Sequence, residues 1–174
     1  MRSLKYCVDC SLDGFIARDD HSYGFLIREG EHFDEFLESM KTFDIALMGK
    51  TTYDVGLKAG VIDPSLNLQQ FVISSSLDKT FDDRIKIISK NASKFVGRLK
   101  SEKGNDILLS GGSTLATNLL DENLIDEIQL RIHPVIIGSG IRLFGSHNKT
   151  ISLQVRRQKL YSNHVTLLAY DVKY

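Results

Sequence analysis

The chain is poor in the residues that mark covalently stapled or membrane-embedded proteins. It has two cysteines, two prolines and no tryptophan among its 174 residues. Two cysteines are too few for a disulfide scaffold, and residues 1–14 lack the apolar run of a signal peptide, so we expect a cytoplasmic protein. No apolar stretch approaches the ~20 residues of a membrane-spanning helix, which argues against a membrane protein.

The chain also lacks an excess of either charge. It carries 22 Lys and Arg against 22 Asp and Glu, a formal net charge of +0. No global field draws such a protein to nucleic acid or to anionic lipid, so we expect neither as a partner. A phosphorylated ligand would have to be held by local hydrogen-bond donors.

Cys7 and Cys10 have the C-x-x-C spacing of redox and zinc sites. They lie in an alternating apolar run typical of a strand, where residues three apart point to opposite faces. No second cysteine pair is present to complete a zinc site, and the histidines lack metal-ligand spacing. We expect packing roles for both cysteines and no metal.

Hydrophobic periodicity predicts strands that alternate with helices over most of the chain. Glycine and serine clusters separate the elements, and Asn91 is a candidate helix N-cap. The predicted strands are Ser3–Asp9, Asp44–Met48, Gln70–Ser74, Arg84–Ser89, Asp106–Ser110 and residues 126–137, and the predicted helices are residues 30–43, 50–55, 91–104 and Ser113–Glu122.

The C-terminal end differs in kind, because Ile151–Tyr161 and Val165–Val172 flank the turn signal 162–164 and predict a β-hairpin. Strands separated by helices imply parallel βαβ units with helices on both faces of the sheet. We therefore expect a single domain over residues 1–174. Its predicted architecture is a three-layer α/β/α sandwich with a mixed, mostly parallel sheet and a C-terminal antiparallel hairpin.

Twice the chain passes from a short apolar strand through glycine into a helix with Ser or Thr in its first turn, at residues 47–52 and 109–114. Glycine permits a sharp turn and a close ligand approach, and the free N–H groups of a helix start favour an anion. Both junctions can hold phosphate, with Lys50 in one of them and the serines 74–76 ending a third strand. Ordinary strand-to-helix turns are the alternative. Neither a P-loop nor a complete dinucleotide fingerprint is present.

These residues resemble a known family. The segments 11–17 (SLDGFIA), 48–53 (MGKTTY), 111–115 (GGSTL), 124–127 (LIDE) and 134–140 (PVIIGSG), followed by Leu143 and Phe144, occur in the order seen in the dihydrofolate reductase-like superfamily. Within it the chain most resembles the C-terminal reductase domain of the riboflavin-biosynthesis bifunctional deaminase-reductase and its stand-alone relatives. The resemblance covers nearly the whole chain and implies an eight-stranded mixed sheet, NADPH as hydride donor and a homodimer.

The resemblance also implies which residues bind the cofactor. Gly49, Lys50, Thr51 and Thr52 match the family's cofactor-binding turn, where arginine is more usual than Lys50. Gly111, Gly112, Ser113 and Thr114 match the turn around the pyrophosphate. Ser74 and Ser75 match the strand end beside the adenosine ribose and its 2′-phosphate, and Ile16 and Ala17 match the segment beside the nicotinamide carboxamide.

The substrate side is less defined by the sequence. Dihydrofolate reductases carry a buried carboxylate on the first helix, and Asp34 is the candidate here, with a solvated helix residue as the alternative. Asp13 is a second candidate catalytic carboxylate, although an Asp-Gly pair also forms turns. Arg28, Lys58 and Arg142 are candidate cations for a phosphorylated substrate, Phe25 is the candidate for the family's loop tryptophan, and His133 is expected to be a packed strand residue.

Three functions remain open at this point. The first is an NADPH-dependent reductase that transfers a hydride to a small heterocyclic substrate, of the 5-amino-6-(5-phosphoribosylamino)uracil reductase type. Dihydrofolate reduction is an alternative with the same cofactor. A nucleotide-binding module without turnover is the third.

Overall fold

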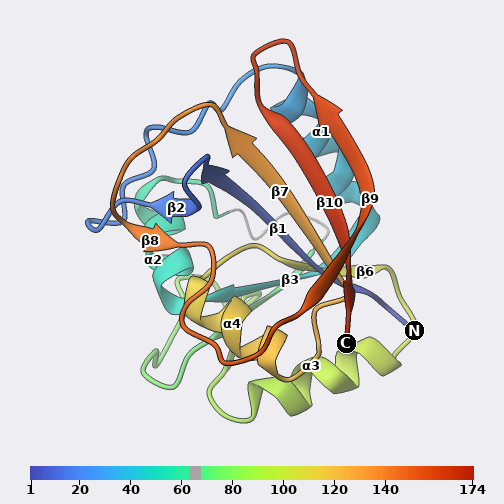
Figure 1. Ribbon diagram of the computed structural model, residues 1–174. Helices are drawn as coiled ribbons and strands as arrows, with labels where there is room; N and C mark the ends of the chain where they lie inside the picture. Colours follow the sequence, from blue (N-terminus) through green and yellow to red (C-terminus); the bar gives the residue numbers. More distant parts are fainter. Residues whose placement is uncertain (63–67) are drawn as a thin grey trace.

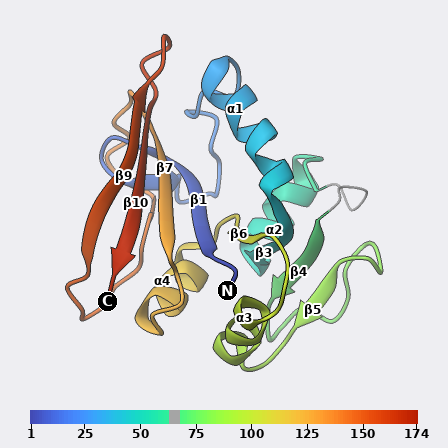
Figure 2. The ribbon, with the colours of Figure 1, turned by 90° about the vertical axis from the view of Figure 1, so that its right-hand side faces the viewer.

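The computed structural model describes residues 1–62 and 68–174. Its main sheet has eight strands in the order β5-β4-β3-β6-β1-β7-β10-β9 (Figure 1). The first six of these are parallel to their neighbours, and β10 runs antiparallel to both β7 and β9. Strands β4 and β5 lie at one edge and the C-terminal hairpin at the other (Figure 2).

The elements follow the predicted order, with two short strands, β2 and β8, added. The strands are β1 (Leu4–Ser11), β2 (Phe15–Ala17), β3 (Phe43–Gly49), β4 (Gln69–Ile73), β5 (Lys86–Ile88), β6 (Asp106–Leu109), β7 (Glu127–His133), β8 (Ile141–Arg142), β9 (Ser152–Leu160) and β10 (Thr166–Lys173). The helices are α1 (Glu31–Ser39), the 3-10 turn η1 (Met40–Thr42), α2 (Lys50–Lys58), α3 (Ala92–Ser101) and α4 (Ser113–Asp121).

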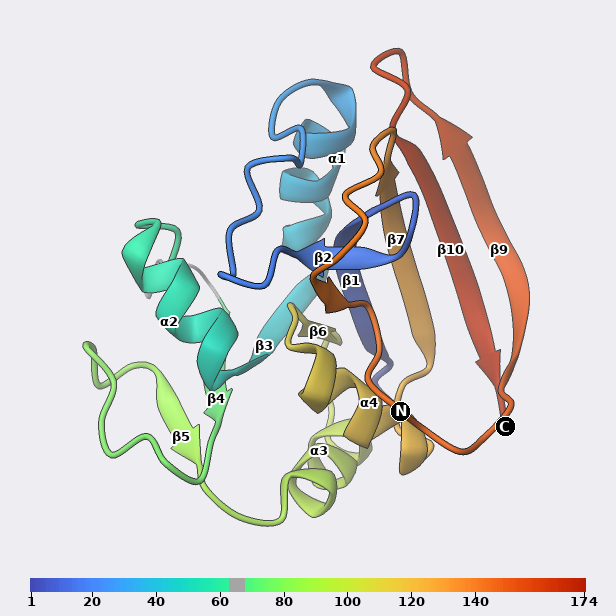
Figure 3. The same ribbon diagram turned by 60° about the vertical axis from the view of Figure 1, so that its left-hand side comes forward.

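Helices cover both faces of the sheet (Figure 3). On one face, Val96 of α3 and Leu119 of α4 pack with Tyr6 and Leu109 in the largest core cluster. On the other face, Phe36 of α1 and Met40 of η1 pack on a smaller cluster around Cys7, Ala46 and Leu108, and α2 packs Tyr53 on Met48 and Val72. The predicted three-layer sandwich with a mixed, mostly parallel sheet and a C-terminal hairpin is confirmed.

The predicted strand over residues 126–137 is wrong at its end, because β7 stops at His133. Pro134 follows, and proline has no N–H to continue a strand ladder. The strand β8 was not predicted. It pairs with β2 in a small separate sheet, with Phe15 opposite Arg142.

Cys7 and Cys10 are both buried as free thiols. In the part of the chain that the structure describes, no helix is long and apolar enough to cross a bilayer.

Candidate functional site

A cleft of about 1220 Å³ opens where the strands end at their carboxyl edge. Residues of β1, β3 and β6 form its floor, and α1, α2, β2 and the start of α4 form its walls. Parallel α/β sheets bind their ligands at this edge. The cleft exceeds the few hundred Å³ of an ordinary small-molecule site and has room for a ligand of dinucleotide size.

The two glycine junctions meet inside this cleft. Gly111 and Gly112 have φ values of 141° and 99°, which side chains rarely adopt. A Cβ on Gly112 would lie 3.5 Å from Thr52 Oγ1 and 3.6 Å from the backbone N of Gly49. The starts of α2 and α4 therefore lie side by side, and no described side chain caps either helix. Their first N–H groups are available to an anion.

Every residue that the resemblance assigns to the cofactor lines this one cleft. Segments far apart in sequence are thus brought together as the resemblance implies, although the structure contains no ligand and their role in binding stays a prediction. They are Ile16, Ala17, Gly49, Lys50, Thr51, Thr52, Ser74, Ser75, Gly111, Gly112, Ser113 and Thr114.

Two lysines lie at the strand ends around the cleft, one of them paired with a carboxylate. Lys50 Nζ lies 2.5 Å from Asp54 Oδ2 one turn along α2, so its charge is shared with a carboxylate. Lys90 also lines the cleft, just beyond the end of β5, and sequence reasoning missed it. The signal was available, since Lys90 comes directly after the predicted strand Arg84–Ser89, much as Lys50 comes just after Asp44–Met48. Ser74 Oγ accepts hydrogen bonds from the backbone N–H groups of Ser76 and Leu77 and so shapes this turn.

The structure brings neither candidate catalytic carboxylate to the cleft. Asp34 lies exposed on α1, outside the cleft lining. Asp13 accepts backbone hydrogen bonds from Gly138 at 2.8 Å and from Ile137 at 3.3 Å, and so ties the loop after β1 to the loop after β7. A hydrogen bond that the Asp13 carboxylate accepts from the Ser11 side chain, together with those from Gly138 and Ile137, holds the pKa of this carboxyl below its usual value.

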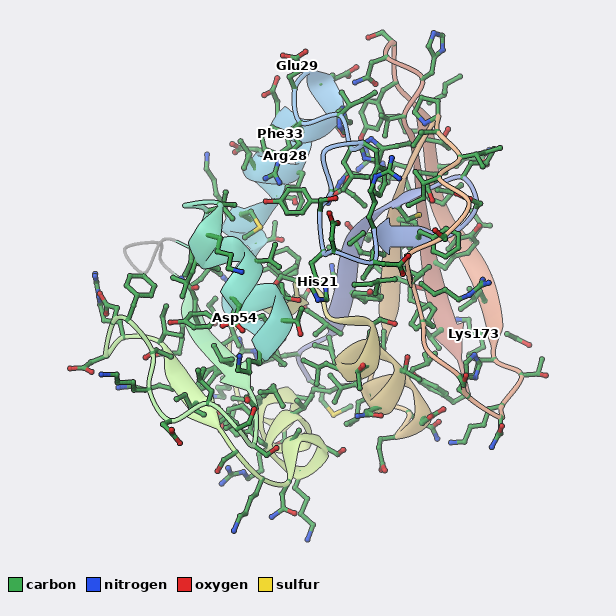
Figure 4. The ribbon with its side chains drawn as sticks, turned by 90° about the vertical axis from the view of Figure 1, so that its left-hand side faces the viewer. His21, Arg28, Glu29, Phe33, Asp54 and Lys173 are labelled. Carbon is green, nitrogen blue, oxygen red and sulfur yellow. The ribbon has the colours of Figure 1, made fainter. Side chains whose placement is uncertain are left out.

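The other substrate-side candidates differ in whether they line the cleft. Arg28 lines the cleft, and its guanidinium lies over the rings of Tyr23 and Phe33. Figure 4 shows Arg28 beside Phe33 at the start of α1, across from α2 with its Asp54. Lys58, Arg142 and Phe25 do not belong to the lining.

A carboxylate that sequence reasoning missed stands on the cleft floor. Asp9 of β1 faces β7, where Arg131 Nε donates to its Oδ1 at 2.8 Å and Arg131 Nη2 to its Oδ2 at 2.7 Å. His133 Nε2 lies 2.9 Å from Oδ1. Burial opposes ionisation of Asp9, but the hydrogen bonds from His133 and Arg131 outweigh it and hold the pKa of this carboxyl well below its usual range.

His133 is a buried strand residue, as expected, but it also links Asp9 to the loop before α1. Its Nδ1 accepts the backbone N–H of Ile27 at 3.0 Å, so the proton lies on Nε2 and is donated to Asp9. His32 is buried on the other side of Ile27, and its Nε2 lies 2.9 Å from the Ile27 carbonyl oxygen. Two histidines therefore hold the backbone of Ile27, and one of them, His133, also binds Asp9.

Among the described residues, no group of three or more His, Cys, Asp or Glu side chains is placed to hold a metal ion.

Comparison with known proteins shows the family of the chain and its fold. Residues 3–167 match the family model of the RibD C-terminal domain. The chain therefore belongs to the RibD C-terminal domain family.

Solved structures with the same fold include a putative riboflavin biosynthesis protein from Shewanella sp. PV-4, with a TM-score of 0.84 and 24% identity over all of both chains. The diaminohydroxyphosphoribosylaminopyrimidine deaminase/5-amino-6-(5-phosphoribosylamino)uracil reductase of Thermotoga maritima matches 98% of this chain with 56% of its own, at TM-score 0.71 and 15% identity. Dihydrofolate reductase from Enterococcus faecalis, complexed with NADP(H), matches 98% of this chain with 94% of its own, at TM-score 0.66 and 12% identity.

At the sequence level, YwjB of Bacillus subtilis is 34% identical over 97 residues, and YyaP of the same organism is 33% identical over 98 residues. These alignments cover 56% of this chain, and 56% and 52% of the two proteins, so they span about half of each relative.

Proposed function

We propose that the protein is an NADPH-dependent reductase that transfers a hydride to a heterocyclic substrate, of the 5-amino-6-(5-phosphoribosylamino)uracil reductase type. The observation that carries the proposal is the meeting of two uncapped helix starts at Gly49 and Gly112 in one large cleft. Family membership and the fold shared with a reductase whose structure was solved in complex with NADP(H) support it.

The residues present fit a phosphorylated dinucleotide. The N–H groups at the starts of α2 and α4 would hold the pyrophosphate without a net positive charge on the protein. Lys50, Ser74 and Lys90 follow three adjacent parallel strands, β3, β4 and β5, and would hold the 2′-phosphate that distinguishes NADPH from NADH. Ile16 and Ala17 of β2 would flank the nicotinamide.

The cofactor supplies the hydride, and the chain supplies position and electrostatics. Asp9 carries no proton at neutral pH, because its pKa is held low by His133 and Arg131. This carboxylate can accept hydrogen bonds from a substrate but cannot deliver a proton to one. The proton that accompanies the hydride would then come from solvent.

A binding assay followed by a turnover assay tests the proposal. NADPH should bind, as reported by its nicotinamide fluorescence, and its absorbance should fall when 5-amino-6-(5-phosphoribosylamino)uracil is added. Dihydrofolate is the second substrate to test, and oxidation of NADPH by dihydrofolate alone would favour that alternative. Binding without oxidation by any heterocycle would favour a nucleotide-binding module, and absence of binding would refute the proposal.

Lys50→Ala tests the cofactor assignment. We expect it to raise KM for NADPH by about tenfold and to change KM for NADH little, because only NADPH carries the 2′-phosphate. Lys103→Ala, which removes an exposed lysine outside the cleft, is the matched control. Equal effects of Lys50→Ala on both cofactors would remove Lys50 from this role.

A further inference from the structure

Asp9 is the only acidic side chain in the described lining of the cleft. Its side chain is 29% exposed, whereas those of Arg131 and His133 are 5% and 0% exposed. Arg131 and His133 are therefore buried in the floor of the cleft, whereas part of the Asp9 side chain is exposed to the cleft.

The carboxylate still has capacity to accept hydrogen bonds. Oδ1 receives two, from Arg131 Nε and His133 Nε2, whereas Oδ2 receives one, from Arg131 Nη2. The two oxygens of an ionised carboxylate offer about four acceptor positions in all. At least one position on Oδ2 thus remains for a donor that enters the cleft.

The stability of the fold does not explain why the ion pair of Asp9 and Arg131 lies in the floor of the cleft. A buried ion pair is often no more stabilising than apolar side chains of the same volume, because both charges lose their hydration. The Arg131 guanidinium lies 4.0 Å from the centre of the Phe36 ring, in an otherwise apolar part of the cleft. Recognition of a ligand explains a charged pair at this position better than fold stability does.

The walls around Asp9 suit a flat ring. Phe33 and Phe36 line the cleft from α1, and the small side chains of Cys7 and Ala46 line it from the sheet. An aromatic heterocycle can enter the cleft beside Phe33 and meet Asp9 with its edge.

We propose that Asp9, fixed by Arg131 and His133, determines substrate specificity by accepting hydrogen bonds from an N–H-bearing edge of the heterocycle. The ligand class is a flat ring with an exocyclic amine or a ring N–H at that edge, and its role as the hydride acceptor rests on the proposed reductase function. An ionised carboxylate only accepts, so a ring with an oxygen or nitrogen acceptor there is repelled. Arg131 and His133 are positioning residues, since they act through Asp9.

The test compares two rings of similar shape. The protein is titrated calorimetrically with 2,4-diaminopyrimidine, whose amino groups donate, and with 2,4-dimethoxypyrimidine, which has no N–H, each with and without saturating NADPH. We expect the diamino compound to bind about tenfold more tightly or better, as a hydrogen bond to a charged group allows.

Two variants should abolish the preference for the diamino compound and leave the Kd for NADPH within about a factor of two. They are Asp9→Asn and the double variant Asp9→Asn/Arg131→Gln, which removes both charges together. Asp78→Asn, an exposed carboxylate outside the cleft, is the matched control and should keep the preference. A purely structural role for Asp9 would lower stability without changing the ratio of the two affinities.

The proposal is overturned if the folded variants keep the preference. It is also overturned if the unmodified protein shows none, an outcome that needs no variant to fold. If NADPH fails to bind but the preference is present and depends on Asp9, the reductase function fails while the recognition site stands.

Discussion

At the scale of single residues, burial acts in opposite directions on neighbouring side chains of β1. Asp9 finds Arg131 and His133 within hydrogen-bond distance and stays ionised. At Cys7 and Cys10 the charge of Arg131 offsets burial only in part, so burial raises the pKa of Cys7 to about 12 and that of Cys10 to about 11. Both thiols therefore act as apolar packing groups.

These thiols make stability depend on pH on the alkaline side. Both pKa values are raised in the folded state, so the stabilisation is fully present below the unfolded value near 9 and is lost as pH rises toward 11 for Cys10 and toward 12 for Cys7. We expect the free energy of unfolding in urea to fall above pH 9 by about 1.4 kcal/mol per pH unit for each thiol. Cys7→Ala should lose about half of that slope between pH 9 and 10, and an unchanged slope would contradict the assignment.

At the scale of elements, the site depends on two glycine turns that allow two helices to begin side by side. Gly112 combines a φ of 99° with a position facing the backbone of Gly49. A side chain there would strain the backbone and would occupy the space between the two helix starts. Glycine is therefore needed at position 112 for two reasons: it allows the turn, and it leaves space for a ligand to approach.

Gly112→Ala should raise the Kd for NADPH about tenfold or more, because the new methyl group fills the cradle, and should lower the free energy of unfolding by about 1–3 kcal/mol through backbone strain. Gly97→Ala is the matched control, since Gly97 lies within α3 and an added Cβ there meets nothing within 4 Å. It should leave NADPH binding unchanged and raise the free energy of unfolding by about 0.5–1 kcal/mol. Fluorescence titration and urea denaturation measure the two effects, and equal NADPH affinities would contradict the role of Gly112.

Elements defined by local pattern were predictable from the sequence. The predicted strands Gln70–Ser74 and Asp106–Ser110 agree with β4 and β6 to within about one residue at each end. An apolar run that stops at glycine or serine carries both the strand and its turn in a few consecutive residues. The two glycine junctions are local in the same way, so the sequence could propose them as anion sites, whereas their meeting in one cleft follows from the order of the parallel strands.

Features that depend on distant pairing were not predictable. Asp9 and Arg131 lie 122 positions apart and meet because β1 and β7 pair in parallel register. Strand β8 has two residues and no periodicity of its own, and it exists only because β2 lies opposite. Asp34 was proposed by analogy with a helix carboxylate, but α1 turns this residue to solvent and presents Phe33 and Phe36 to the cleft.

At the scale of the whole molecule, the C-terminal hairpin exposes an apolar surface. Leu153, Val155 and Leu160 of β9 are 45%, 56% and 69% exposed. Val155 lies opposite Tyr170 of β10, and paired residues of antiparallel strands share a face, so the apolar surface continues onto β10. An exposed apolar surface on an edge strand favours association with another chain.

We propose that this surface joins two copies of the chain in a homodimer, as the family resemblance implies. Sedimentation velocity should then show a species of twice 19.6 kDa. Val155→Lys should shift it toward the monomer, because the interface would bury an unpaired ammonium group, and it should change the unfolding free energy of the monomer by no more than about 0.5 kcal/mol, since the residue is exposed there. Val61→Lys, which alters an equally exposed valine beyond the end of α2, should leave the dimer intact. A monomeric unmodified protein, or a Val155→Lys variant that remains dimeric, would contradict an interface through β9.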